Sequence, residues 1–215
     1  MSSHAPPGMG AVYRAVLDTM AEHGARQPPI AQIARLALTN RQFLYRNWPK
    51  PENLFRDACA AELNRILSVA ADTEATGTGD GPTPPSCHVI AQIVRAARLL
   101  REHPVTEATA RTSPDLCLAA LAGSATPLHL RALHWLRGRL YTLHSGGDLE
   151  IMADALLTIA TPFALIPPAS PGPAERTRLD TQLCSALHSC LSSPPACTSC
   201  GTKNPPAPHQ EGPTG

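Results

Sequence analysis

The sequence predicts an all-α protein. Its 215 residues are 43% hydrophobic but only 4% aromatic, and it is rich in Ala and Leu, which favour packed helices over sheets. Apolar residues recur at intervals of three and four along most of the chain, a spacing typical of helices that bury one face. An all-β fold is therefore disfavoured, and the length allows a small module joined to a larger helical domain.

The formal net charge of +1 excludes a strong global attraction to nucleic acid or membrane, so any such contact must be local. The first residues lack a secretory signal, and no apolar run reaches the length of about 20 residues that a membrane span needs. We therefore expect a cytoplasmic protein with no membrane segment. The seven cysteines are odd in number and irregularly spaced, which favours thiols over disulfides in that compartment.

The N-terminal third predicts four helices in close succession. The first carries Tyr13, Val16 and Met20 on one face and ends near Gly24, a typical stop. Short helices are expected over 30–37 and 41–48, since proline precedes the first and follows the second. A longer helix is expected over 51–71, because Pro51 can open it and its apolar residues share one stripe.

The rest of the chain predicts further helices between proline- and glycine-rich segments. The stretch 72–86 holds little to bury and is expected to be a flexible loop. Helices are expected from about 89 to 103, and then over 105–111, 115–122, 128–144, 149–165 and 175–191. The tail 192–215 is Pro-, Ser-, Thr- and Gly-rich and is expected to be disordered. We predict three parts: a module over 1–50, a helical domain over 51–191, and the tail.

Residues 30–48 predict a helix-turn-helix. This motif needs a small residue where its helices cross, a compact turn, and an apolar anchor on the second helix. Ala34, the turn 38–40 and Leu44 meet these needs. The outward face of the second helix then carries donors and acceptors able to reach base edges or phosphates: Asn40, Arg41, Gln42 and Tyr45. Lys50, before the next helix, is expected close to a phosphate.

These segments resemble the TetR family of transcriptional regulators. AVLDTMAEHG and IAQIARLALTNRQFLYRNWPKPENLF follow its pattern of a first helix ending in glycine, a helix-turn-helix with Leu-Tyr-Arg, and an aromatic-Pro-Lys segment before the fourth helix. The resemblance covers about residues 12 to 58. It implies an all-helical homodimer that binds double-stranded DNA at a palindromic operator and holds a small-molecule effector in its C-terminal domain. It also implies base contact from Arg41, Gln42 and Phe43 and phosphate contact from Tyr45, Asn47 and the start of the fourth helix.

Several positions depart from the family pattern. Leu38 stands where the turn usually has glycine, so a positive φ there would store strain on the order of 1 kcal/mol. Pro29 replaces a threonine that would contact phosphate, and Pro51 replaces a lysine, with Lys50 one residue earlier. The first 57 residues carry seven basic and four acidic side chains, a net +3. Non-specific DNA binding is therefore expected to be weak.

The helical domain offers candidates for a ligand pocket. His134, Trp135 and Tyr141 lie on one predicted helix and could line a pocket, or the two aromatic residues could simply fill the core. Arg95, Arg98 and Arg101 form a basic helical edge, which is usually a solvated face. Helices 149–165 and 175–191 are the candidates for the subunit interface, as a four-helix bundle of paired helices. No phosphate-binding loop, nucleophile elbow or zinc-protease motif occurs, so we expect neither catalysis nor a cofactor.

Two other interpretations remain open at this point. The chain could be a helical protein-interaction module that keeps the scaffold without binding an operator. It could also be a thiol- or metal-gated regulator, because the C-terminal segment places an H-x-C pair before a C-x-x-C pair: His188, Cys190, Cys197 and Cys200. The short, proline-rich setting of these residues favours an inert tail.

Overall fold

The chain is all-helical wherever its structure is described. A computed structural model describes residues 8–24, 29–72, 84–121, 126–143, 149–167 and 172–191. These residues form ten α-helices and no strand, which confirms the predicted fold class. In chain order the helices are α1 (Met9–His23), α2 (Ile30–Leu36), α3 (Arg41–Asn47), α4 (Pro51–Ala71), α5 (Pro85–Arg101), α6 (Pro104–Thr112), α7 (Pro114–Leu121), α8 (Pro127–Leu140), α9 (Leu149–Leu165) and α10 (Pro173–Cys190).

The helix bounds follow the sequence pattern closely, with two differences. Helix α5 begins at Pro85, inside the stretch expected to be a loop, while residues 73–83 of that stretch and the tail lie outside the described residues. Helix α8 ends at Leu140 rather than at residue 144, because residues 141–143 form a turn. The predicted helices over 51–71 and 149–165 match α4 and α9.

Proline marks the start of most of these helices. Six of them have proline as their first residue: Pro51, Pro85, Pro104, Pro114, Pro127 and Pro173. Proline suits this position because its fixed φ is already helical and its missing N–H group would have no partner within the helix. Part of the unusual proline content therefore encodes helix starts.

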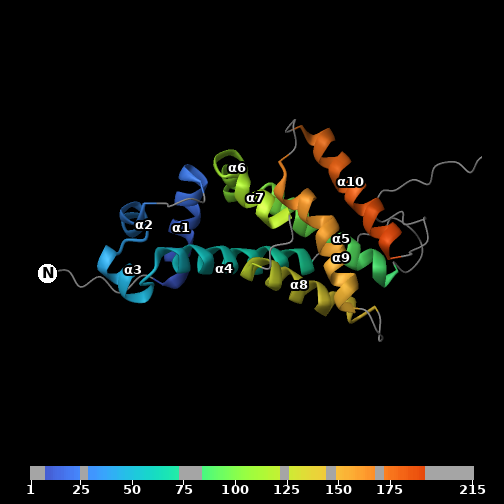
Figure 1. The fold of residues 1–215 in the computed structure, drawn as a ribbon, viewed down its shortest axis with the longest axis horizontal. Helices are drawn as coiled ribbons and strands as arrows, with labels where there is room; N and C mark the ends of the chain where they lie inside the picture. Colours follow the sequence, from blue (N-terminus) through green and yellow to red (C-terminus); the bar gives the residue numbers. More distant parts are fainter. Residues whose placement is uncertain are drawn as a thin grey trace, which may run out of the picture.

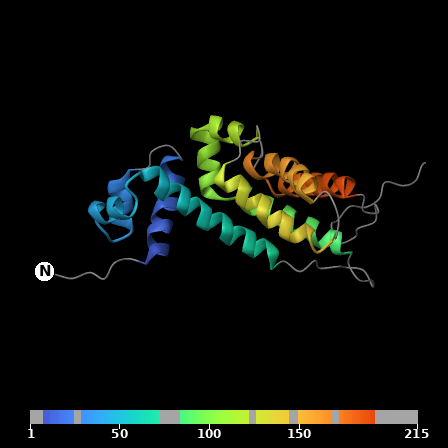
Figure 2. The same ribbon diagram turned by 60° about the horizontal axis from the view of Figure 1, so that its bottom comes forward.

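Helix α4 joins two groups of helices. Figures 1 and 2 show α1, α2 and α3 at one end of the molecule and α5, α8, α9 and α10 at the other, with α4 extending between them. The first group closes over a core that includes Val12, Val16, Ile33, Leu44 and Leu54. The second core includes residues from α5, α8, α9 and α10. No helix of the described residues is long and apolar enough to cross a membrane.

Two arginines of α5 form ion pairs with Asp180, and one of them, Arg101, is buried rather than solvated, contrary to expectation. The buried Arg101 donates from Nη1 to the Phe163 carbonyl oxygen and from Nη2 to Asp180 Oδ1, both at 2.8 Å. Arg98 Nε donates to the other oxygen of Asp180 at 2.7 Å. Because Asp180 lies in the middle of α10 and Phe163 near the end of α9, this network ties the C-terminal ends of α5 and α9 to α10. Of the predicted basic edge, Arg95 and Arg98 are exposed, as expected.

Candidate nucleic-acid interface

Helices α2 and α3 are joined by a tight turn with the geometry expected of a helix-turn-helix. Ala34 is buried where the helices cross, and Leu44 turns its side chain into the core of the N-terminal module. The Thr39 N–H donates to the Ala34 carbonyl at 2.9 Å, which closes the end of α2. Leu38 has φ +52° and is 77% exposed, so it holds a left-handed conformation with its side chain in solvent. Leu38 therefore has the positive φ that is expected where the family pattern has glycine.

Two of the predicted DNA-contacting residues also shape α3 itself. Asn40 caps the helix, since its Oδ1 accepts from the Phe43 N–H at 2.7 Å. Asn47 donates from Nδ2 to the Phe43 carbonyl at 2.8 Å near the end of the helix. One group of each side-chain amide therefore remains available to bind DNA. In Asn40 this is Nδ2, a donor, and in Asn47 it is Oδ1, an acceptor.

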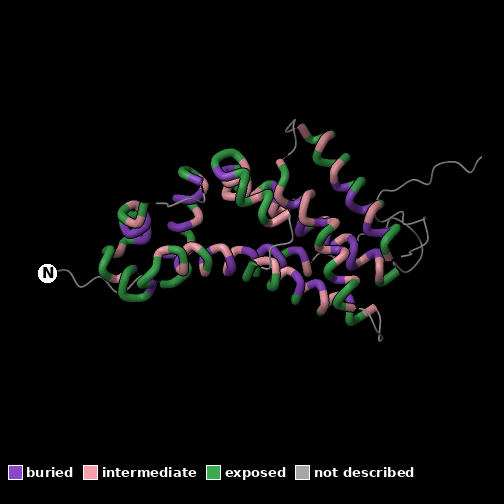
Figure 3. Tube along the Cα trace, in the orientation of Figure 1, coloured by how far each residue is buried: buried purple, intermediate pink, exposed green. Residues whose placement is uncertain are grey.

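The outward face of α3 is polar and accessible. Arg41 and Gln42 are exposed, and Tyr45 is 48% exposed, so Tyr45 is not a core residue. Figure 3 shows most of α3 in the colour of exposed residues, at the end of the molecule farthest from α10. Phe43 is half-buried against the N-terminal core, and the Arg46 guanidinium lies 5.9 Å from its ring centroid. Phe43 thus combines packing with partial exposure.

The junction between α3 and α4 places Lys50 at the surface. Lys50 is the exposed N-cap residue of α4, and its carbonyl accepts from the Asn53 N–H at 3.0 Å. Pro51 has no N–H group, so the start of α4 offers an anion fewer backbone donors than an ordinary helix start. A phosphate at this position would be held mainly by the Lys50 ammonium group.

Trp48 fixes this junction, a role that the sequence pattern did not indicate. Its side chain is buried, and its Nε1 donates at 3.1 Å to Oδ2 of Asp57, which lies in the second turn of α4. Its ring also packs against Tyr13 of α1, with 6.1 Å between the ring centroids. These contacts connect the end of α3 to α1 and α4 and so position Lys50.

Unpaired positive charge collects on the N-terminal module. Most arginines of the described helical domain form ion pairs, such as Arg98 with Asp180 and Arg137 with Glu150. In the described part of the module and the α3–α4 junction, by contrast, five basic side chains have no ion pair: Arg14, Arg35, Arg41, Arg46 and Lys50. Unneutralised cations on an exposed surface are available to phosphates.

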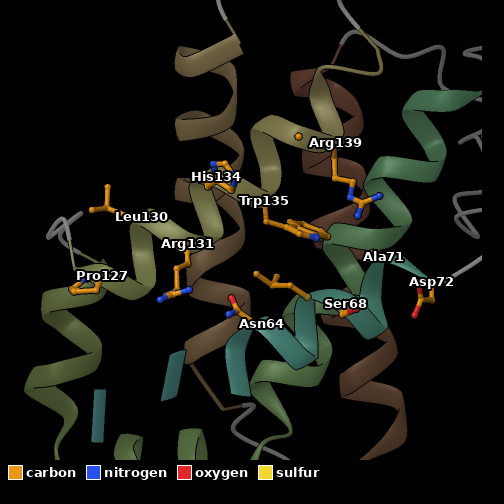
Figure 4. A pocket seen from close by; sticks show the side chains of 12 residues that line it. Asn64, Ser68, Ala71, Asp72, Pro127, Leu130, Arg131, His134, Trp135 and Arg139 are labelled. Carbon is orange, nitrogen blue, oxygen red and sulfur yellow. The ribbon is translucent and has the colours of Figure 1, made fainter. Parts of the chain in front are cut away.

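A groove of about 1030 Å³ lies between α4 and α8 in the helical domain. Of the three predicted pocket residues, His134 and Trp135 line it, as Figure 4 shows. Tyr141 does not line it: this residue is 74% exposed in the turn after α8. The prediction for Tyr141 assumed that α8 continues to residue 144, but the helix ends before it.

The proposed metal or thiol site lies mostly outside the described residues, which include neither Cys197 nor Cys200. At the end of α10, His188 is buried and Cys190 is exposed, so their side chains do not share one surface. Among the described residues, no group of three or more His, Cys, Asp or Glu side chains could hold a metal ion.

Comparison with known proteins identifies the fold. No protein-family model and no curated protein matches the sequence. Among solved structures, a transcriptional regulator from Rhodococcus sp. Rha1 has 16% identity and a TM-score of 0.55, with 86% of this chain and 96% of that chain covered. The TetR family repressor AlkX from Dietzia sp. strain DQ12-45-1b, implicated in biodegradation of n-alkanes, has 19% identity and a TM-score of 0.55, covering 85% and 98%. RolR in complex with resorcinol has 16% identity and a TM-score of 0.53, covering 86% and 93%.

Proposed function

We propose that this chain, which has the fold of TetR-family transcriptional regulators, is itself a DNA-binding regulator in the cytoplasm. In this proposal it binds a palindromic operator as a homodimer, represses transcription, and is released by a small-molecule effector. The observation that carries the proposal is the exposed face of α3 in a helix-turn-helix, with Arg41, Arg46 and Lys50 on this helix and its junction forming no ion pair in the described chain. The fold of the solved regulators supports it.

We assign the contacts to DNA by the chemistry of each side chain. Arg41 and Gln42 would read base edges, because guanidinium and amide groups can bond guanine and adenine in two places. Phe43, half-exposed, would contact a thymine methyl group. Phosphates would be held by the remaining exposed polar groups of this face: Asn40, Tyr45, Asn47 and Lys50.

Two copies of the chain would pair through α9 and α10. The outward face of α9 carries Ile151, which is 70% exposed, and Ile166, at 50% exposure, lies just beyond its end. The outward face of α10 holds small hydroxyl residues, among them Thr177 and Thr181, whose hydroxyls donate to carbonyls of their own helix. The threonines suit close packing against a second copy because they are small and their hydroxyls already have hydrogen-bond partners. The exposed isoleucines suit it because they are apolar.

Helix α4 would connect the effector to DNA. Its first residues form the junction with Lys50, while its last two turns line the groove beside α8. A helix of this length spans about 30 Å, so a tilt at one end displaces the other. The effector acts only if it binds the DNA-competent and DNA-incompetent arrangements with different affinity. RolR, solved with resorcinol, shows that this fold can accommodate a small molecule.

The test is selection of bound fragments from random duplex DNA by the full-length protein. The proposal predicts enrichment of a two-fold symmetric sequence, bound more tightly than unrelated DNA across a range of salt concentrations. If no sequence is enriched, operator binding is excluded and the protein-interaction alternative gains support.

A further inference from the structure

The groove between α4 and α8 has an unusual distribution of charge. Two arginines of α8 line it, and neither forms an ion pair with any described residue: Arg131 and Arg139. Asp72, at the end of α4, is the one acidic residue among the lining side chains. In Figure 4, Asp72 lies toward the Arg139 end of the groove, whereas the amide of Asn64 lies toward the Arg131 end. The Arg131 end therefore offers a cation and an amide donor with no carboxylate among the residues lining it.

The groove has an indole ring in its lining, that of Trp135. Trp135 lies between the two arginines on the same face of α8, and the Arg139 guanidinium lies 5.7 Å from its ring centroid. The indole Nε1 is buried and has no hydrogen-bond partner in the described chain. Indole and guanidinium groups are both able to pack against the face of another aromatic ring.

Gly138 keeps space open beside this ring. A Cβ atom added at Gly138 would meet no atom within 4 Å, although the residue lies inside α8 and lines the groove. Glycine inside a helix costs about 1 kcal/mol relative to alanine. The helix thus gives up stability at a position where the bare backbone leaves room in the groove.

We propose that this groove binds a planar aromatic anion, a carboxylate or sulfonate. Its acidic group bonds to Arg131 and Asn64, and its ring lies against Trp135 in the space beside Gly138. This inference names the chemical class of the effector and so rests on the proposed function for its biological role, although binding itself can be measured without DNA.

Calorimetric titration of the full-length protein with 2-naphthoate and with the neutral 2-naphthamide tests the charge. We expect the anion to bind about tenfold more tightly, as a hydrogen bond to a charged group implies. Arg131→Gln removes this preference, while Arg95→Gln, at an exposed arginine of α5 outside the groove, retains it. Equal affinity for the two probes, or equal losses in the two variants, overturns the proposal.

Gly138 provides the steric test. Gly138→Leu fills the groove and abolishes binding of both probes, whereas Gly138→Ala adds one methyl group and retains binding. Both variants are expected to melt at or above the temperature of the wild type, which separates blocking from unfolding. Naphthoate binding to Gly138→Leu with wild-type affinity contradicts the assigned site. Operator selection with the same protein is a separate experiment. If the protein binds an operator but not naphthoate, only the proposed ligand class is refuted. If it binds naphthoate but no operator, only the proposed regulatory function is refuted.

Discussion

Leu38 is a residue whose backbone conformation conflicts with its side chain. Its φ of +52° is costly for any residue with a Cβ atom, and its exposed side chain contributes little packing in return. We predict that Leu38→Gly raises the free energy of unfolding by about 1 kcal/mol relative to Leu38→Ala, which keeps the Cβ atom but also removes the exposed side chain. Urea unfolding of the two variants measures the difference. A glycine variant no more stable than the alanine variant would show that the turn is unstrained.

Glu62 is held ionised by Arg65 on α4 and by His103, the residue that caps the start of α6. Hydrogen bonds from Arg65 lower its pKa most, against the opposing effect of burial, and His103 Nε2 lies 3.2 Å away. Because the folded-state pKa is lowered, this stabilisation is complete above the unfolded-state pKa and is lost as the pH falls through the folded value. We predict that Glu62→Gln costs about 0.5 to 1 kcal/mol at pH 7. The cost should shrink below about pH 4.5.

Denaturant unfolding at pH 7 and at pH 3.5 measures this dependence. The matched control is Glu107→Gln, which breaks a more exposed pair with Arg111 and should change stability less. A cost of Glu62→Gln that is the same at both pH values contradicts the assignment.

Single residues were predictable from the sequence where a local motif fixes them. Ala34, Leu38 and Leu44 occupy a turn whose geometry depends on neighbours within a few residues, so spacing alone predicts their roles. The pairs Arg101 with Asp180 and His103 with Glu62 join residues far apart in the chain. Such pairs depend on tertiary packing, which no local pattern specifies, and this is why Arg101 was expected in solvent.

Helices were predictable because their apolar spacing and their prolines agree. The long helices α4 and α9 match the expected ranges, and proline opens six helices in the described chain. The end of α8 was less predictable, since residues after Leu140 have no glycine or proline stop until residue 146. Tyr141 therefore leaves the helix that was expected to place it in the groove.

Helices α1 and α6 meet at a contact that only glycine allows. Gly24 follows α1 with φ +86°, and a Cβ atom there would lie 2.1 Å from Thr112 Oγ1 at the end of α6. We predict that Gly24→Ala destabilises the protein by about 2 kcal/mol or more, from backbone strain together with the clash. Thermal unfolding measures this loss.

A double variant separates the two causes. Thr112→Ala removes Oγ1, the atom closest to the added methyl group, and Cγ2, but keeps Cβ, which lies 2.9 Å away, so it should recover part of the loss in the Gly24→Ala background. If the effects of the two substitutions on the free energy of unfolding are additive, the methyl group added at Gly24 does not clash with Thr112.

At the scale of the whole molecule, the dimer proposal depends on α9. We predict that the double variant Ile151→Glu with Ile166→Glu shifts the protein from about twice the chain mass of 22.8 kDa to the mass of one chain. The reason is that buried, unpaired carboxylates are costly at an interface. Light scattering after size-exclusion chromatography measures the mass, and Leu118→Glu, at an exposed residue of α7, is the control. A double variant that stays dimeric places the interface elsewhere.

The central claim is that the exposed face of α3 reads DNA, and Arg41 tests it most directly. Anisotropy titrations of the selected duplex and of a scrambled duplex compare the wild type with Arg41→Ala, Lys50→Ala and Arg95→Ala. We predict that Arg41→Ala weakens binding to the selected duplex by about 1 to 3 kcal/mol, with a smaller effect on the scrambled one. Lys50→Ala should weaken both alike, and Arg95→Ala neither. Wild-type affinity for the selected duplex in both Arg41→Ala and Lys50→Ala would contradict the account.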